Sequence, residues 1–189
     1  MVKASWRSEG GTKVIRLISG AAAAILLALV LVLATRDIDN GLGANSPLVG
    51  QLVPAIVGTD FAGRTFDVDE YKNSWVLVNF FASWCVPCIR EHPELDEWSR
   101  RHEFDGIVIS VPFGDTEKDA RKFFTDYGGD WPVLMDIDAL WAVAFGVLRP
   151  PESFLAAPGG VVVARWQGAI TAAAVDEVMA SVELEAFGS

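Results

Sequence analysis

Residues 17–34 constrain this chain most, because they form 18 consecutive positions without a charged side chain. As a helix rising 1.5 Å per residue, this segment would be ~27 Å long, close to the ~30 Å hydrocarbon core of a bilayer. The charges on the two sides differ: Lys3, Arg7, Lys13 and Arg16 precede the segment with one acid, Glu9, and Arg36, Asp37 and Asp39 follow it. The positive-inside rule therefore predicts a membrane anchor, with everything C-terminal to it outside the cytoplasm.

This prediction divides the chain into four parts. They are a cytoplasmic basic segment at 1–16, the anchor at 17–34, a tether at 35–48 rich in Gly, Asn and Asp, and one extracytoplasmic domain at 49–189. A cleaved signal peptide is the alternative for the apolar segment, but the apolar region of signal peptides is usually about 7–15 residues long. A buried core helix fits poorly, because the segment shows no amphipathic period.

Charge and cysteine content narrow the function classes. The whole chain has a net charge of −10, and the part after residue 34 holds 11 basic and 24 acidic residues, a net charge of −13. This acidity argues against nucleic acid or an anionic membrane surface as the main partner of the domain. Two cysteines are too few for a disulfide scaffold or for a four-cysteine metal site.

Strand and helix signals alternate along the exported part. The apolar runs at 75–81 and 106–111 predict buried strands, the first of them central. The runs at 153–157 and 161–166 predict a hairpin around the Pro-Gly-Gly sequence at 158–160. Helices are expected at 87–102, 116–127, 138–145 and 171–187, with one short helical turn within 61–71. This order indicates an α/β domain with a mixed sheet.

The chemistry is concentrated in Trp84-Cys85-Val86-Pro87-Cys88, where the strongest predicted strand meets a helix. Two cysteines at i and i+3 of a helix start can close a small disulfide. The Cys85 thiol should face solvent, and the helix N-terminus should lower its pKa. Cys88 lies one turn further in and is better shielded. This division suits thiol–disulfide exchange, with Cys85 as the nucleophile and Cys88 as the resolving thiol.

Two other interpretations of the cysteines stay open. An inert structural disulfide suits an oxidising compartment, although a bridge over so short a loop stabilises little. A metal site would use Cys85, Cys88, His92 and His102, but the spacing C-x2-C-x3-H-x9-H matches no usual zinc pattern. His92, directly before Pro93, is expected to be a surface helix residue. No metal and no other cofactor is predicted.

Several separated motifs together resemble one known family. They are VNFFASWCVPC at 78–88, Glu91-x-Pro93, WPVLMD at 131–136, FGV at 145–147, PESF at 151–154 and GAIT at 168–171. In this order they resemble the membrane-tethered TlpA/ResA/DsbE type of thioredoxin-fold protein, the extracytoplasmic thiol–disulfide oxidoreductases of bacteria. The resemblance runs from about residue 49 to the C-terminus. It implies a thioredoxin-like fold with a central insertion at about 113–135.

The resemblance also implies a substrate groove. Pro151 matches a cis-proline that packs against the CxxC motif, and an X-Pro bond is the chemically sensible place for a cis peptide. The other groove positions are Trp84, Pro87, Pro150 and Glu152. Pro150 departs from the family pattern, because it has no N–H to offer an extended substrate. One substrate hydrogen bond, typically worth ~0.5–1.5 kcal/mol, is therefore missing.

Proton handling is expected to depend on Glu91. This residue matches an acid that the family places near the redox pair, where it could exchange a proton with Cys88. Asn79 stands where ordinary thioredoxins carry a buried Asp, and Asn cannot titrate. Proton transfer is therefore expected to depend more strongly on Glu91. The alternative for Glu91 is a solvated helix charge.

Three functions fit these features. The first is a reductant for apocytochrome c or other exported proteins, recharged by a membrane thiol–disulfide transporter. The second is an oxidant or isomerase of secreted proteins, and the third is a non-catalytic binding or metal-delivery module. The CxxC motif and the cis-proline candidate count against the third. The first two share every motif and differ in redox potential. The expected location of the oxidoreductase is the bacterial cell membrane, with its catalytic domain on the outer side.

Overall fold

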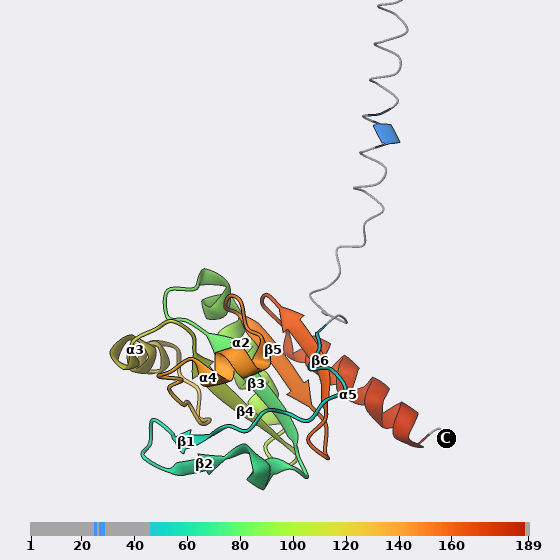
Figure 1. Ribbon diagram of the computed structural model, residues 1–189, viewed down its shortest axis with the longest axis horizontal. Helices are drawn as coiled ribbons and strands as arrows, with labels where there is room; N and C mark the ends of the chain where they lie inside the picture. The colour runs from blue at the N-terminus through green and yellow to red at the C-terminus, as the bar shows by residue number, and fades with distance from the viewer. Residues whose placement is uncertain (1–24, 26, 29–45, 188–189) are drawn as a thin grey trace, which may run out of the picture. The chain divides into compact units, whose positions relative to one another are not determined.

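The computed structural model describes residues 25, 27, 28 and 46–187. The predicted cytoplasmic segment, and the predicted anchor apart from three of its positions, lie outside the described residues. Among the residues that are described, no helix is long and apolar enough to cross a membrane. Residues 46–187 form a domain with one four-stranded sheet of order β4-β3-β5-β6 and a separate hairpin of β1 and β2 (Figure 1).

The elements of this domain alternate between strands and helices. In chain order they are β1 (Val57–Thr59), β2 (Thr65–Asp67), the 3-10 helix η1 (Val68–Tyr71), β3 (Trp75–Phe81), α2 (Val86–Arg101), β4 (Gly106–Pro112), α3 (Glu117–Tyr127), α4 (Leu140–Phe145), β5 (Glu152–Ala156), β6 (Val162–Gln167) and α5 (Ala172–Phe187). β3 runs parallel to β4 and antiparallel to β5, and β6 is antiparallel to β5. The predicted mixed sheet with a central strand at 75–81 is therefore confirmed.

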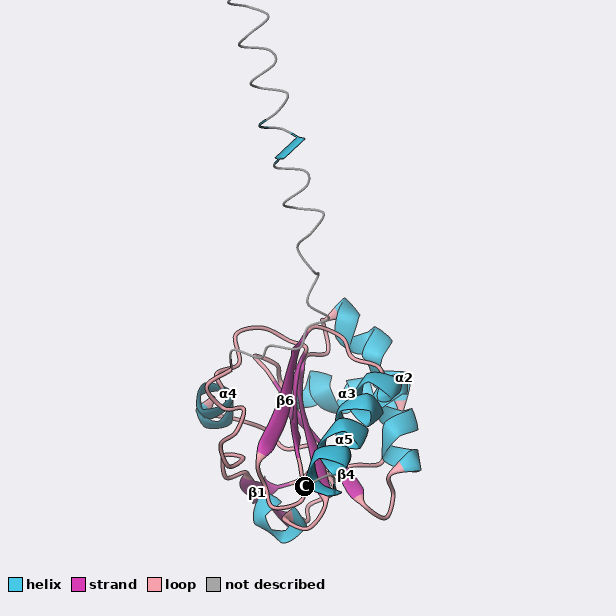
Figure 2. Ribbon diagram, turned by 90° about the vertical axis from the view of Figure 1, so that its right-hand side faces the viewer, coloured by secondary structure: helices cyan, strands magenta, loops and turns pink. Residues whose placement is uncertain are grey.

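Other elements cover the sheet on both faces. All seven residues of β3, its central strand, are therefore buried. Successive side chains of a strand point to opposite faces. Val76, Val78 and Phe80 join the apolar cluster that includes α4, whereas Trp75 and Leu77 join the cluster formed with α2 and α5. Figure 2 shows α4 on one side of the sheet and α2 and α5 on the other. Helix α2, with its N-terminal cysteines, is thus packed directly against the central strand.

Two predicted segments differ from the structure by more than a one-residue shift of a boundary. The helix expected at 138–145 begins only at Leu140, because Ala139 adopts a left-handed conformation with φ 54°. The Asp136 carboxylate accepts hydrogen bonds from the N–H groups of Trp141 and Ala142 at 3.2 and 2.8 Å, which caps the first turn. The segment expected to hold only a turn and a helical turn, 61–71, also contains β2. A three-residue strand is too short to show a period in the sequence.

Candidate active site

Cys85 and Cys88 are joined by a disulfide at the N-terminus of α2, with their Cα atoms 5.2 Å apart. Cys85 is the N-cap residue, and its sulfur accepts a hydrogen bond from the Cys88 N–H at 3.3 Å. Pro87 lies in the first turn, where its missing N–H costs no helical hydrogen bond. No acidic residue occupies this first turn. The positive end of the helix dipole therefore faces the sulfurs without a compensating charge within the turn.

The disulfide is more enclosed than the sequence suggests. Cys85 is 4% exposed and Cys88 is 1% exposed, so the expectation that Cys85 faces open solvent is wrong for the disulfide form. Both residues belong to an apolar cluster that includes Phe123 of α3. Trp84 and Val86 are each 63% exposed and flank Cys85 in the chain. These two side chains form an exposed apolar rim beside the enclosed disulfide.

A cis peptide bond joins Pro150 to Pro151, as the family resemblance implies for this position. Glu152, the next residue, begins β5 and pairs with Phe80 near the C-terminal end of β3. Cys85 follows the end of β3 by four residues. The cis-proline loop and the disulfide therefore lie at the same end of the sheet.

Glu91 is buried, and the alternative of a solvated helix charge is wrong. Its Oε1 accepts a hydrogen bond from Asn79 Nδ2 at 2.9 Å, and its Oε2 accepts one from the Ile170 N–H at 3.1 Å. Burial raises the pKa of Glu91 to about 7, although the two hydrogen bonds act in the opposite direction. Residues three apart on a helix are neighbours, so this titratable carboxyl lies one turn beyond Cys88.

His92 is also buried, which corrects the expectation of a surface position. Its Nε2 bonds to the Gly128 carbonyl at 2.8 Å, and since a carbonyl only accepts, Nε2 carries the proton. The ring packs against Phe123 and Trp131 with centroid distances of 4.9 and 5.2 Å. Burial lowers the pKa of His92. His102 lies beyond the other end of α2, bonded to two carboxylates, so the four candidate metal ligands are not brought together.

Glu152 does not face a groove, because its side chain is fully buried. Its carboxylate accepts hydrogen bonds from Arg165 Nε at 3.0 Å and from the N–H groups of Leu148 and Arg149 at 2.9 and 3.3 Å. Glu152 therefore holds the loop before the cis-proline from inside the fold. Sequence reasoning missed Arg165, and its only sequence signal is a charge within the apolar run of β6.

Asp115 is a second residue that sequence reasoning missed. Its carboxylate accepts hydrogen bonds from the Ser83 N–H at 2.6 Å and from the Ser83 hydroxyl at 3.1 Å. These bonds fix the loop between β3 and Cys85. No local sequence signal could have found this pair, because the two residues are 32 positions apart.

Comparison with known proteins accounts for this arrangement. Residues 49–171 match the AhpC/TSA family. The chain belongs to this family. The thiol–disulfide oxidoreductase ResA of Bacillus subtilis (strain 168) is 29% identical over 138 residues, which cover 72% of this chain and 77% of the relative. The ResA of Bacillus anthracis is 30% identical over 116 residues, which cover 61% of this chain and 67% of the relative.

Solved structures show the same fold. A crystal structure of a DsbE-type thiol:disulfide interchange protein from Chlorobium tepidum matches with a TM-score of 0.65 and 24% identity, covering 70% of this chain and 96% of that chain. The thioredoxin-like fold expected from the sequence is therefore confirmed. Together with the ResA relatives, the family membership makes this chain a thiol–disulfide oxidoreductase of the ResA/DsbE type.

Proposed function

We propose that this oxidoreductase works outside the cytoplasm and reduces disulfides of exported proteins, apocytochrome c among them, while residues 17–34 anchor it in the membrane. The observation that supports reduction, rather than oxidation, of the substrate is the buried, titratable Glu91 one helical turn beyond Cys88. The resemblance of the chain to the ResA relatives supports the substrate class. The apolar length and the charge asymmetry of residues 1–39 support the anchor.

The charges around the disulfide favour an electron donor. A strong oxidant of this class has a stabilised reduced form, and cations near the thiolate provide such stabilisation. Here the buried groups that follow Cys88 on α2 are Glu91, whose ionised form repels a thiolate, and His92, whose lowered pKa favours its neutral form. The apolar cluster around both cysteines also disfavours a thiolate. These surroundings oppose the stabilisation that the helix N-terminus gives to the Cys85 thiolate, so the dithiol gives up its electrons more readily than that of a strong oxidant.

The proposed reaction has two exchange steps. The Cys85 thiolate attacks a substrate disulfide, forms a mixed disulfide and releases one substrate thiolate, which takes a proton from solvent. Cys88 then loses its proton, with Glu91 as the nearby acceptor, and its thiolate attacks the Cys85 sulfur. This releases the second substrate thiolate and leaves the Cys85–Cys88 disulfide. The substrate gains two electrons, which a membrane thiol–disulfide transporter would later return to the protein.

The redox potential of the full-length protein tests the direction. Equilibration with dithiol and glutathione buffers at pH 7 should give a potential near −270 mV or lower, the range of thioredoxin-type reductants. A potential at or above about −180 mV, the range of protein disulfide isomerase and DsbA, would overturn the proposal and assign an oxidant or isomerase.

Variants of the two cysteines test their roles in cells. Cys88→Ser should accumulate mixed disulfides with partner proteins, because the resolving thiol is absent, and Cys85→Ser should accumulate few. Equal trapping by both variants would contradict the assignment of Cys85 as the nucleophile. Identification of the trapped partners also tests the substrate class.

The anchor has its own test. Full-length protein should stay in the membrane fraction after washes with high salt and with alkaline buffer. Recovery of a soluble chain that lacks about the first 34 residues would show a cleaved signal peptide instead.

A further inference from the structure

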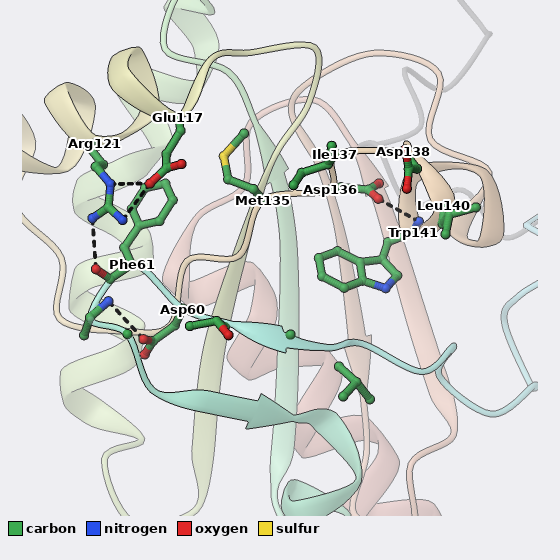
Figure 3. Close-up of a pocket in the computed structure, with 15 residues that line it drawn as sticks. Asp60, Phe61, Glu117, Arg121, Met135, Asp136, Ile137, Asp138, Leu140 and Trp141 are labelled. Carbon is green, nitrogen blue, oxygen red and sulfur yellow. Dashed lines mark hydrogen bonds and ion pairs between the residues drawn. The ribbon is translucent and has the colours of Figure 1, made fainter.

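A pocket of about 830 Å³ lies between β1, the start of α3 and the chain from Met135 to Trp141 (Figure 3). Its volume falls in the range of about 300–1,000 Å³ that is typical of ligand sites. Phe61 and Met135, which line it, also pack against the apolar cluster that contains Cys85 and Cys88. The pocket therefore shares part of its lining with the apolar cluster that holds the redox pair, and it extends toward α4.

One wall of the pocket is the edge of β1 that faces away from β2. The Asp60 N–H donates to the Arg64 carbonyl opposite it, so this pair is a hydrogen-bonded pair of the two antiparallel strands β1 and β2. Hydrogen-bonded and non-hydrogen-bonded pairs alternate along antiparallel strands. Val57 and Thr59 belong to non-hydrogen-bonded pairs, so their backbone N–H and C=O groups point away from β2. No hydrogen bond among residues 46–187 uses the N–H of Val57 or of Thr59. The neighbouring chain pairs with this side at Leu134 and then diverges.

Uncovered apolar side chains border this edge. Ile137 is 87% exposed and Leu140 is 67% exposed, and both line the pocket. Figure 3 shows Trp141 and Met135 above the β1 strand and Leu140 at one end. An exposed apolar surface is typical of an interaction site, and an open strand edge is a template for pairing with another chain. The two features together fit an extended peptide.

The charges at the pocket favour a basic partner. Asp136 and Asp138 stand at the α4 end, and at the other end Glu117 is paired with Arg121 at 2.7 Å. Residues 35–189 carry a net charge of −13. A segment with lysine or arginine beside its apolar residues complements this surface, since opposite potentials steer association and set its register.

We propose that this pocket docks an extended apolar segment, flanked by basic residues, of the protein whose disulfide is exchanged. The segment adds a strand to β1 through the N–H and carbonyl groups of Val57 and the N–H of Thr59, and its alternate side chains contact Ile137, Leu140 and Trp141. Docking raises the effective concentration of the substrate disulfide at Cys85. The identity of the partner as the substrate rests on the proposed function, whereas binding of the segment needs no thiol chemistry.

A cysteine-free peptide tests the docking directly. The probe is a fluorescent, end-blocked peptide of sequence Lys-Val-Ile-Val-Lys, titrated with purified full-length protein and followed by anisotropy. Ile137→Asp and Leu140→Asp should each weaken binding at least tenfold. Val143→Asp is the matched control, because Val143 is 77% exposed on the same helix and lies outside the pocket, and it should change binding less than twofold. A peptide N-methylated at its central residues should also bind at least tenfold more weakly.

The outcomes separate this proposal from the proposed function. Absence of peptide binding by the wild type, or equal weakening by Leu140→Asp and Val143→Asp, would overturn the docking site. A dimer of the wild type that Leu140→Asp dissociates would assign the surface to a second copy of the chain and overturn the docking proposal. Binding to lipid vesicles that the peptide fails to displace would overturn the docking proposal as well. Exchange of the wild type with oxidised glutathione is measured in parallel. Loss of that exchange with intact peptide binding would overturn the proposed function alone.

Discussion

Two buried glutamates stand behind the two halves of the candidate active site, and they have different partners. Glu152 supports the loop before the cis-proline and forms an ion pair with Arg165. Glu91 lies behind the disulfide, and its two hydrogen bonds within residues 46–187 come from neutral donors, the Asn79 amide and the Ile170 N–H. The same side chain thus serves as a structural link in one region and as a titratable group in the other.

The difference follows from the cost of burying a charge. A carboxylate removed from water needs either a counter-charge or a proton, because hydrogen bonds alone compensate only part of the desolvation. Arg165 supplies the counter-charge to Glu152, whereas Glu91 has a pKa raised to about 7 and changes its charge near neutral pH. A group with this property is useful beside a pair of thiols that must gain and lose protons.

The largest expected effect comes from breaking the ion pair. Glu152→Gln keeps the shape of the side chain but leaves the Arg165 guanidinium buried without a counter-charge. We expect a loss of about 3–5 kcal/mol in the free energy of unfolding, measured by urea denaturation at pH 7. Asp69→Asn, which removes an exposed pair with Lys72, is the control and should cost less than about 1 kcal/mol. Similar losses in both variants would contradict the structural role of Glu152.

The second effect is a dependence of stability on pH that Glu91 produces. Its pKa is higher in the folded protein than the ordinary 4.5, so the folded state binds more protons than the unfolded state between pH 4.5 and 7. This contribution is complete below pH 4.5 and is lost as pH rises through about 7. His92, with a lowered pKa, acts oppositely and is destabilising below its ordinary 6.5.

The difference between wild type and Glu91→Gln isolates Glu91, because both proteins retain His92. We expect this difference in unfolding free energy to change by about 2 kcal/mol between pH 5 and 8, with the wild type losing stability at high pH relative to the variant. Urea denaturation at several pH values measures it. Parallel curves would show that Glu91 does not titrate in this range.

The third effect concerns the thiols of the reduced protein. If the charge of Glu91 acts on the CxxC pair, Glu91→Gln should lower at least one thiol pKa and speed alkylation near pH 7 by about tenfold. If Glu91 instead accepts the Cys88 proton, the variant should accumulate mixed disulfide during turnover. The pH profiles of alkylation and of disulfide reduction separate the two roles, and superimposable profiles for both proteins would exclude each of them.

The smallest expected effect concerns the hydrogen bond that Asn79 makes with Ser153. Its amide donates to both Glu91 Oε1 and the Ser153 hydroxyl, the latter at 3.0 Å. Ser153→Ala removes one of these bonds and should cost about 1 kcal/mol of unfolding free energy, with the alkylation profile of the thiols unchanged. A changed alkylation profile would mean that Ser153 sets the orientation of Asn79 and, through it, the proton affinity of Glu91.

Local patterns in the sequence were sufficient to predict the main strands and helices of the domain. The run at 75–81 predicted the central strand, and Cys85 and Cys88 were expected at the start of the following helix, where the structure has them. The hairpin of β5 and β6 was also found. These features depend on residues within about one turn or one strand, so the sequence carries them directly.

Burial and pairing of the polar groups depended on the tertiary structure. Glu91 takes its hydrogen bonds from residues 12 and 79 positions away, and Glu152 finds Arg165 across a strand pair. His92 is enclosed by aromatic side chains of the α3 region, which the sequence places more than 30 residues later. The chain by itself determined the fold class and the position of the cysteines. Only the packed fold decided which acids are buried and which can titrate, because desolvation and hydrogen bonding arise from neighbours in space rather than in sequence.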